Sequence, residues 1–503
     1  MDAQLVTVSR RLSSGRSLWG NFVTGVITLA FVSGATANIR ELDVAGPGSA
    51  DQQRVQSALL NNGTIVFVWE DRSGTDSEIR YRLFKPATSV FSAIQTANAA
   101  SPGDQVDPVI TPLFNGGFAI AFASRVADAD YDVLFRRFDS AGVALDVADV
   151  AVNTTTAGSQ QHPDITTLDD GSFVVAFSGP GSDGQDLFFR RFSPAGGALD
   201  VAEVELNAFG LDAVVAGDQA GVKIDTFPEG GWMAVFEDRA SDDLYGVRFS
   251  NAGAPYRDPN GAIDEFYFLL NKATANEQFA PSLAAFGDEQ FAVVYNSDTD
   301  GTAAGRRVLL RIFNSGGPVT GDIQVGAANQ RSQDADVAPI GGPNLAVAWK
   351  TLEPAGGGDV WSVYSQVFTL GGSPLGTPLF MHSDQSINHA RPHVIPWLDG
   401  GFATVWETGG AGGTVGARTV APSTASPGMM SAFLTGPSEA QVYQISFIGF
   451  PGECYELQAT DTLNNWSTIL TTNAPSGSFL YADPDGAATP HRFFQVKRKL
   501  SGL

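Results

Sequence analysis

A short segment in which an apolar run leads from a turn to an aromatic residue recurs along most of the chain. It reads FNGGFAIAF at 114–122, LDDGSFVVAF at 168–177, PEGGWMAVF at 228–236 and LDGGFATVW at 398–406. Seven copies align on their closing aromatic residues, which lie 53, 55, 59, 59, 54 and 57 residues apart: Trp69, Phe122, Phe177, Phe236, Tyr295, Trp349 and Trp406. Such regular spacing predicts a repeat architecture.

Each repeat reads as four short β-strands. In the third unit they lie at 163–168, 172–178, 186–192 and 200–207. Turns rich in Gly and Asp separate them, as in hairpins and meanders. The second strand is apolar on both faces, Phe173 and Val175 on one and Val174 on the other, so it needs cover on both sides. Four-stranded units packed between two neighbours form a β-propeller, whereas an open solenoid needs polar capping repeats that the array lacks.

The two ends of the repeat array complement each other. The seventh unit stops after GTVGARTV at 413–420, one strand short. The texts ALDVADVAV and ALDVAEVEL, read as fourth strands in other units, have a close match in NIRELDVAG ahead of the first unit. We therefore predict an all-β, seven-bladed propeller over residues 38–420, closed by an N-terminal strand at 39–46.

Residues 1–37 have the features of a cleavable signal peptide. Arg10, Arg11 and Arg16 precede an apolar stretch that ends in the small residues Ala35-Thr36-Ala37. A retained membrane anchor is the alternative interpretation. Since no other long apolar run occurs, no membrane span is expected in the mature chain. The predicted location is secreted or cell-surface.

A second module follows the linker APSTASPG at 421–428. Residues 429–503 predict a small β-sandwich with strands AQVYQISFIGF, CYELQAT, WSTILTT, GSFLYAD and RFFQVKR. The pattern YELQATDTLNNW…FLYADPD…RFFQV resembles a C-terminal module of exported bacterial proteins. The repeat text DGGFATVW, with RRF and AGG following in other units, resembles propeller repeats of exported bacterial proteins. These resemblances imply export and a propeller fold, and no particular activity.

The charge of the chain limits its partners and suggests one cofactor. The formal net charge is −24, which repels phosphate backbones and argues against a nucleic-acid partner. Asp128, Asp130 and Asp132 show the D-x-D-x-D alternation of calcium loops. The full EF-hand pattern is absent, and aspartates are also ordinary at hairpin tips. Calcium at these three residues is the only cofactor that the sequence suggests.

Seven copies in one chain act as an internal control, because a residue that recurs in most units serves packing. An arginine recurs on the third strand, which predicts an ion pair or hydrogen bond to a neighbouring blade: Arg82, Arg136, Arg190, Arg311 and Arg418. A glutamine recurs before the first strand, near the expected mouth of the central channel: Gln52, Gln105, Gln160, Gln219 and Gln278. Buried amides need partners, so we expect these to bond between blades.

The seventh unit departs from this pattern. It has His389 at the glutamine position, followed by Arg391 and His393 in the loop NHARPHVIP at 388–396. These residues are candidates for binding a metal or an anionic sugar at the channel mouth, and drift at a tolerant position is the alternative. Tyr131, from the loop between strands two and three of its unit, and Trp361 complete the candidate ligand-binding set.

Enzyme motifs are absent: the chain has no G-x-S-x-G, HExxH, P-loop or sialidase Asp-box. The preferred prediction is an exported, non-catalytic binding or scaffold protein that presents the propeller to extracellular glycan or a surface protein. The first alternative is a polysaccharide-active enzyme with carboxylates at the channel mouth, because such pairs form in space and not in sequence. The second is a purely structural cell-envelope protein. No catalytic residue is predicted.

Overall fold

The computed structural model describes residues 4–9, 41–45, 51–86, 88, 90–99, 103–125, 130–182, 184–208, 217–256, 267–287, 289–340, 343–354, 358–396, 401–409, 414–420, 429–435, 442–448, 454–460, 467–473, 478–483 and 491–499. The predicted linker at 421–428 and the predicted cleavage site after Ala37 lie outside these residues. The described residues are all-β apart from one 3-10 turn, η1 (Ala303–Gly305). None of them forms a helix long and apolar enough to cross a membrane.

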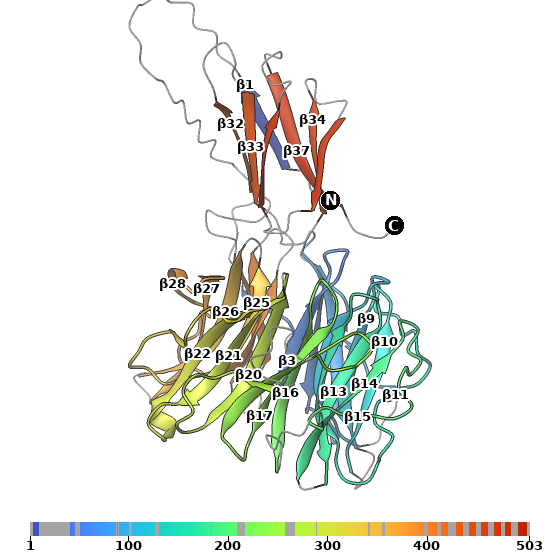
Figure 1. The fold of residues 1–503 in the computed structure, drawn as a ribbon. Coiled ribbons are helices and arrows are strands. Elements are labelled where there is room, and N and C mark those ends of the chain that lie inside the picture. Colours follow the sequence, from blue (N-terminus) through green and yellow to red (C-terminus); the bar gives the residue numbers. More distant parts are fainter. Residues whose placement is uncertain are drawn as a thin grey trace, which may run out of the picture.

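Seven antiparallel sheets follow one another along the chain (Figure 1). The first contains β3 (Gln52–Leu59), β4 (Ile65–Asp71), β5 (Glu78–Lys85), β6 (Val90–Phe91) and β7 (Gln95–Thr96). The second contains β8 (Gln105–Pro112), β9 (Phe118–Ser124), β10 (Asp132–Phe138) and β11 (Val150–Ala151). The third contains β12 (Gln161–Thr167), β13 (Phe173–Pro180), β14 (Gln185–Phe192) and β15 (Val204–Glu205).

The remaining four sheets repeat this arrangement. The fourth contains β16 (Gln219–Thr226), β17 (Trp232–Asp238), β18 (Asp243–Phe249) and β19 (Tyr267–Leu269). The fifth contains β20 (Gln278–Phe286), β21 (Gln290–Asp298), β22 (Arg306–Asn314), β23 (Gly317–Pro318) and β24 (Ile323–Val325). The sixth contains β25 (Ser332–Ile340), β26 (Asn344–Glu353), β27 (Val360–Thr369) and β28 (Pro374–Phe380). The seventh contains β29 (His389–Pro396), β30 (Phe402–Thr408), β31 (Thr414–Val420) and β2 (Glu41–Asp43).

The first strands of the seven sheets form a ring. Contacts run from β3 to β8, β12, β16, β20, β25 and β29, and β29 in turn contacts β3. The fold is therefore the predicted seven-bladed β-propeller, with each sheet as one blade. The closing aromatic residues are all at most 1% exposed, which confirms their predicted role in the core: Trp69, Phe122, Phe177, Phe236, Tyr295, Trp349 and Trp406.

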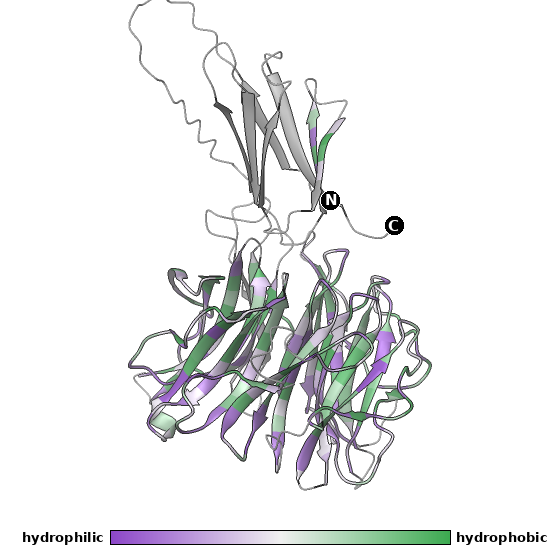
Figure 2. Ribbon diagram, viewed as in Figure 1, coloured by the Kyte–Doolittle hydropathy of each residue, from purple (hydrophilic) through white to green (hydrophobic). Residues whose placement is uncertain are grey.

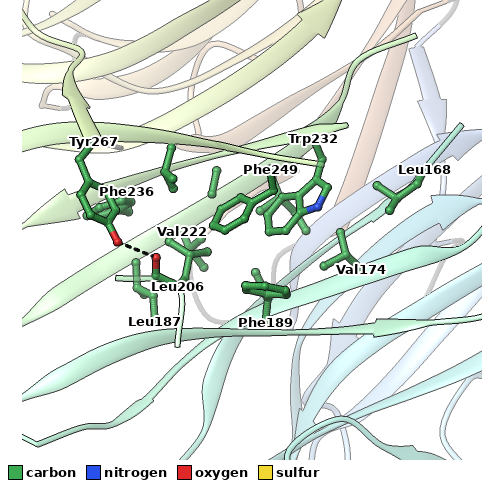
Figure 3. Close-up of a cluster of buried hydrophobic side chains, with 14 residues drawn as sticks. Leu168, Val174, Leu187, Phe189, Leu206, Val222, Trp232, Phe236, Phe249 and Tyr267 are labelled. Carbon is green, nitrogen blue, oxygen red and sulfur yellow. Dashed lines mark hydrogen bonds between the residues drawn. The ribbon is translucent and has the colours of Figure 1, made fainter. Parts of the chain in front are cut away.

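Apolar side chains fill the space between neighbouring blades. Between the third and fourth blades, Trp232 stacks on Phe249 with ring centroids 4.2 Å apart, and Phe189 meets Trp232 edge-on at 5.1 Å (Figure 3). The hydroxyl of Tyr267 donates to the Leu206 carbonyl at 3.1 Å, so the polar tip of this buried ring is satisfied. Green apolar segments accordingly run along the blade strands in Figure 2.

The recurring arginine of the third strand links four of the blades to the blade before them. Arg190 donates to the Val152 carbonyl at 2.9 Å, and Arg311 donates to the Leu270 carbonyl at 2.6 Å. Arg82 and Arg136 make the same bond, to the carbonyls of Val44 and Ala97. The predicted hydrogen bond to a neighbouring blade is confirmed for these four arginines.

The N-terminal segment β2 pairs antiparallel with β31, with Leu42 opposite Ala417. Val44 follows, fully buried, and its N–H donates to the Val415 carbonyl at 3.0 Å. Its own carbonyl accepts from Arg82, as that of Val152 accepts from Arg190. Val44 is thus the structural counterpart of Val152, whereas the LDVA match in the sequence aligns it with Val147, so the textual match is out of register.

The C-terminal strands form two further sheets. One contains β32 (Met429–Thr435), β33 (Val442–Ile448) and β36 (Ser478–Asp483). The other contains β1 (Gln4–Ser9), β37 (His491–Lys499), β34 (Cys454–Thr460) and β35 (Ser467–Asn473). The five strands predicted from sequence correspond to β33–β37, and β32 was not predicted. Because β1 lies within the predicted signal peptide, cleavage after Ala37 would remove it from β37.

Candidate functional site at the axial mouth

Each inner strand of the ring has a β-bulge near its start, where its pairing with the second strand shifts register. One residue in each bulge has a left-handed backbone, with φ between 44° and 62°: Arg54, Asp107, His162, Gly221, Ala280, Asp334 and Arg391. We call these seven residues, with the charged residues that end the adjoining second strands, the axial mouth.

The bulge belongs to the architecture, because every blade has one, but the side chains on it do not recur. A left-handed backbone costs an L-residue about 1–2 kcal/mol, and glycine adopts it freely. Only the fourth blade uses glycine, while five blades carry a charged or titratable side chain there. The fold does not require these five side chains, which makes them the strongest candidates for a function.

Charged groups of alternating sign form a chain across four consecutive blades. Arg391 pairs with Glu407 at 3.1 Å, and Glu407 accepts the backbone N–H of Arg54. The Arg54 guanidinium pairs with Asp107. The other oxygen of Asp107 lies 2.8 Å from Nδ1 of His162. The chain therefore joins the seventh, first, second and third blades.

Three glutamates directly after closing aromatic residues support the bulges. Glu407, Glu70 and Glu237 each accept the backbone N–H of the next blade's bulge residue, at 3.4 Å for Glu70 and 2.5 Å for Glu237. Burial raises the pKa of Glu237 and of Glu407 above the usual range. The sequence analysis did not single these glutamates out, because an aromatic–Glu pair in three of seven units has no obvious partner until the bulge is seen.

His162 has the geometry of a general base. Asp107 faces its Nδ1, and 57% of its side chain is exposed, so the opposite edge of the ring is open to a ligand. Desolvation and then the nearby Arg54 charge lower its pKa below 6.5, which keeps the imidazole neutral at pH 7. Sequence reasoning missed His162, although comparing the bulge position between units would have shown that only the third has a histidine there.

A carboxyl group of raised pKa lies close to this histidine. Glu237 and His162 each shift the other's pKa through their charges. Gly221 makes room for Glu237, because a Cβ on Gly221 would lie 2.8 Å from its Oε1. Glycine at this position thus leaves space for the carboxylate and adopts the left-handed backbone freely.

The predicted residues of the seventh blade do not converge. Arg391 lies at the axial mouth with its side chain 47% exposed. His393 lies beyond the bulge, where its Nδ1 pairs with Asp336 at 2.8 Å and its Nε2 is 3.2 Å from the Ser57 carbonyl. His389 is 1% exposed and packs on His382, with ring centroids 3.5 Å apart. Of these three predicted residues, only Arg391 presents its side chain at the mouth.

His389 replaces part of a recurring amide pair. At four blade interfaces an asparagine donates to the recurring glutamine at 3.0–3.3 Å: Asn98 to Gln105, Asn153 to Gln160, Asn207 to Gln219, and Asn271 to Gln278. The predicted bonding of the glutamines between blades is confirmed at these interfaces. Between the sixth and seventh blades, His382 and His389 hold the two positions, and His382 accepts the Val363 N–H at 3.2 Å.

The two aromatic candidates lie beside residues of the mouth. The backbone N–H of Trp361 donates to Oδ1 of Asn388 at 2.9 Å, and Asn388 lies three residues before Arg391. Nζ of Lys350 lies 4.7 Å from the centre of the Trp361 ring. The Arg125 guanidinium lies 5.0 Å from the Tyr131 ring, and burial raises the pKa of the Tyr131 hydroxyl.

The candidate calcium ligands have protein partners where the structure describes them. Asp130 accepts the Gly158 N–H at 2.9 Å, and Asp132 accepts from Asn153 at 2.6 Å. In the next blade, Asp186 accepts the equivalent hydrogen bond from Asn207 at 2.9 Å. Because the bond recurs, the carboxylate of Asp132 has a role in packing. Asp128 lies outside the described residues. Within the described ranges, no three His, Cys, Asp or Glu residues are grouped to hold a metal.

Deeper along the axis, three aspartates join neighbouring inner strands. Asp164, Asp225 and Asp336 accept backbone N–H groups of the next blade, those of Ile224, Ala285 and Val394, each at 2.8 Å. Desolvation raises the pKa of Asp225 to about 7 from 3.8.

This raised pKa makes stability depend on pH. The folded chain holds a proton on Asp225 that the unfolded chain has lost, so its contribution to stability falls as pH rises from about 4 to about 7. Asp225→Asn removes the charge and keeps an acceptor. Its thermal midpoint (Tm) should exceed that of the wild type at pH 8 and match it at pH 4. Thermal scans at both pH values test this, with the exposed Asp359→Asn as control.

Comparison with known proteins gives the fold. No family model matches the chain, and no curated protein matches it. An ulvan lyase from a polysaccharide lyase family aligns with a TM-score of 0.50 at 10% identity, over 75% of this chain and 95% of that one. A second polysaccharide lyase gives 0.46 at 10%, over 78% and 94%. An α-L-arabinanase of Penicillium chrysogenum gives 0.43 at 14%, over 66% and 98%. At such identities the likeness shows the propeller fold alone.

Proposed function

We propose that this protein is a polysaccharide-active enzyme that works at the axial mouth. The observation that carries the proposal is the set of charged side chains on bulge positions where glycine would cost less. Among them His162 is neutral at pH 7, exposed and oriented by Asp107. The propeller that aligns with a TM-score of 0.50 is a polysaccharide lyase, which suggests a glycan as the ligand. We therefore prefer the enzyme to the non-catalytic binding protein that the sequence favoured.

In this proposal His162 and Glu237 divide the proton transfers. His162 takes a proton from the sugar or from an attacking water, and the Asp107 carboxylate stabilises the imidazolium that forms. Glu237, whose pKa is raised by burial, gives a proton to the leaving oxygen. Their mutual electrostatic influence supports a shared site.

Product analysis tests the proposal. The chain without residues 1–37 is incubated with a panel of neutral and acidic polysaccharides. New reducing ends without a double bond indicate hydrolysis, and an unsaturated sugar at the new end indicates elimination. Binding without any product would favour the non-catalytic alternative. Neither binding nor product would favour a structural role or a protein partner.

We also propose that the chain is exported, with residues 1–37 removed, and that residues 39–46 close the ring. The pairing of β2 with β31 supports the closure. Residues 429–503 would then form a separate sandwich module. N-terminal sequencing of the secreted protein should begin at Asn38, and calorimetric titration should decide whether Asp128, Asp130 and Asp132 bind calcium.

A further inference from the structure

We infer that the ligand of the axial mouth is an anionic glycan, one that carries carboxylate or sulfate groups. The inference rests on the proposed function and names the substrate class of that same site. It is drawn from which member of each ion pair faces solvent, and from where in the ring those pairs lie.

In the ion pairs that join the seventh, first, second and third blades, the basic side chain is exposed and the acid is buried beneath it. The side chains of Arg54 and Arg391 are 34% and 47% exposed, whereas those of their partners Asp107 and Glu407 are 6% and 10% exposed. The side chain of His162 is likewise exposed, at 57%, above the buried Asp107. A molecule that approaches this part of the ring therefore meets positive and neutral donors first.

The buried acids are already engaged within the protein. Glu70 is fully buried, pairs with Arg72 and lies 3.7 Å from Arg54. Glu407 accepts from the Arg54 backbone and from the Arg391 side chain. These carboxylates fix the positions of the arginines and leave outward N–H groups for a ligand. Arginine recognises carboxylate and sulfate oxygens through paired N–H donors.

The arrangement is local and does not follow from composition. The chain carries 54 acidic and 30 basic residues, so an average surface would present acids. In the sixth blade the order reverses, because Asp334 is 29% exposed and its partner Lys350 is 11% exposed. The exposed cations are thus Arg391 of the seventh blade and Arg54 of the first, and the exposed His162 of the third blade continues this surface.

The experiment compares two polymers that differ only in charge. One is a polyuronate, and the other is the same polymer after reduction of its carboxylates to hydroxymethyl groups. The purified chain should bind the polyuronate at least about 10-fold more tightly, and the difference should shrink as salt is added. A sulfated neutral glycan shows whether sulfate replaces carboxylate, and polyglutamate shows whether charge alone suffices.

Two variants and one matched control locate the binding. Arg54→Gln and Arg391→Gln should each weaken polyuronate binding about 10- to 100-fold. Arg137 also pairs with an aspartate, Asp146, but it lies near the C-terminal end of β10, whereas the N-terminal end of β10 pairs with the end of β9 on the side of the mouth. Arg137→Gln should therefore leave the affinity unchanged. Thermal scans establish whether each variant folds. If Arg54→Gln does not fold, the binding measured for Arg391→Gln tests the inference.

The outcomes separate this inference from the function on which it rests. Equal binding or turnover of the charged and the reduced polymer, unaffected by either variant, overturns the anionic ligand and leaves the enzyme in place. Equal binding of polyglutamate and polyuronate overturns the glycan. Absence of binding and turnover with every glycan overturns both proposals.

Discussion

Replacement of His162 by glutamine is expected to lower polysaccharide turnover about 100- to 10,000-fold, the usual contribution of a positioned general base. The imidazole is held by Asp107, and its lowered pKa keeps it neutral at pH 7. In the wild type kcat/KM should rise with pH along a limb whose midpoint lies below pH 6.5 and then level off, since only the neutral base accepts a proton. That limb should disappear in the variant. Rates at a series of pH values provide the measurement.

The chain offers a matched histidine as control. His389→Gln restores the residue found at four other blade interfaces, and the His389 side chain is buried away from the mouth. Its turnover should equal that of the wild type. Glu237→Gln, by contrast, should slow the reaction because it removes the proposed proton donor. Full activity of the His162 variant with an unchanged pH profile would rule out the assigned base.

Deletion of residues 38–46 is expected to lower the Tm of the propeller by many degrees. The deletion exposes the edge of β31, uncovers the site filled by Val44 and removes the carbonyl bonded by Arg82. Burial of one valine contributes about 1.5–3 kcal/mol. Calorimetry of the deleted and intact chains gives the comparison. An unchanged Tm would show that the ring does not need this strand.

A pair of point variants makes the same test more finely. Val44 and Val147 both stand in the text LDVA, but Val44 is fully buried and Val147 is 99% exposed. Val44→Asp should cost about 3 kcal/mol or more, because it buries an unpaired charge. Val147→Asp should change stability by less than about 0.5 kcal/mol. Similar effects of the two would contradict the burial of Val44.

The blades could be predicted because their physical cause repeats along the chain. A strand apolar on both faces needs two neighbours, and the spacing of the aromatic residues counts the units. The arginine of the third strand was predictable for the same reason, since its bond to the preceding blade recurs. The register of the N-terminal strand could not be predicted in this way. The sequence LDVA, shared by the two segments, aligns Val44 with Val147, whereas its hydrogen bond to an arginine makes it equivalent to Val152.

The mouth escaped prediction because its geometry leaves little trace in sequence. Left-handed residues are normally signalled by glycine or asparagine, and six of the seven here are neither. The bond between the Arg54 backbone and Glu407 joins residues 353 positions apart, a distance that no local pattern spans. Arg391 was found only because its segment is unusual among the repeats, and His162 drew no notice beside a recurring glutamine.

The seventh sheet has a consequence for how the molecule is assembled. Among the strands that the structure describes, it is the only blade built from two distant stretches of chain, β2 near the start and β29–β31 after the first six blades. The contact of Glu407 with Arg54 crosses the junction between this sheet and the first. During synthesis the series of charged groups from Arg391 to His162 can therefore form only after the seventh blade has been made. A chain truncated before Glu407 would keep the first six sheets and His162, but it would lose the contact that joins Glu407 to the Arg54 backbone.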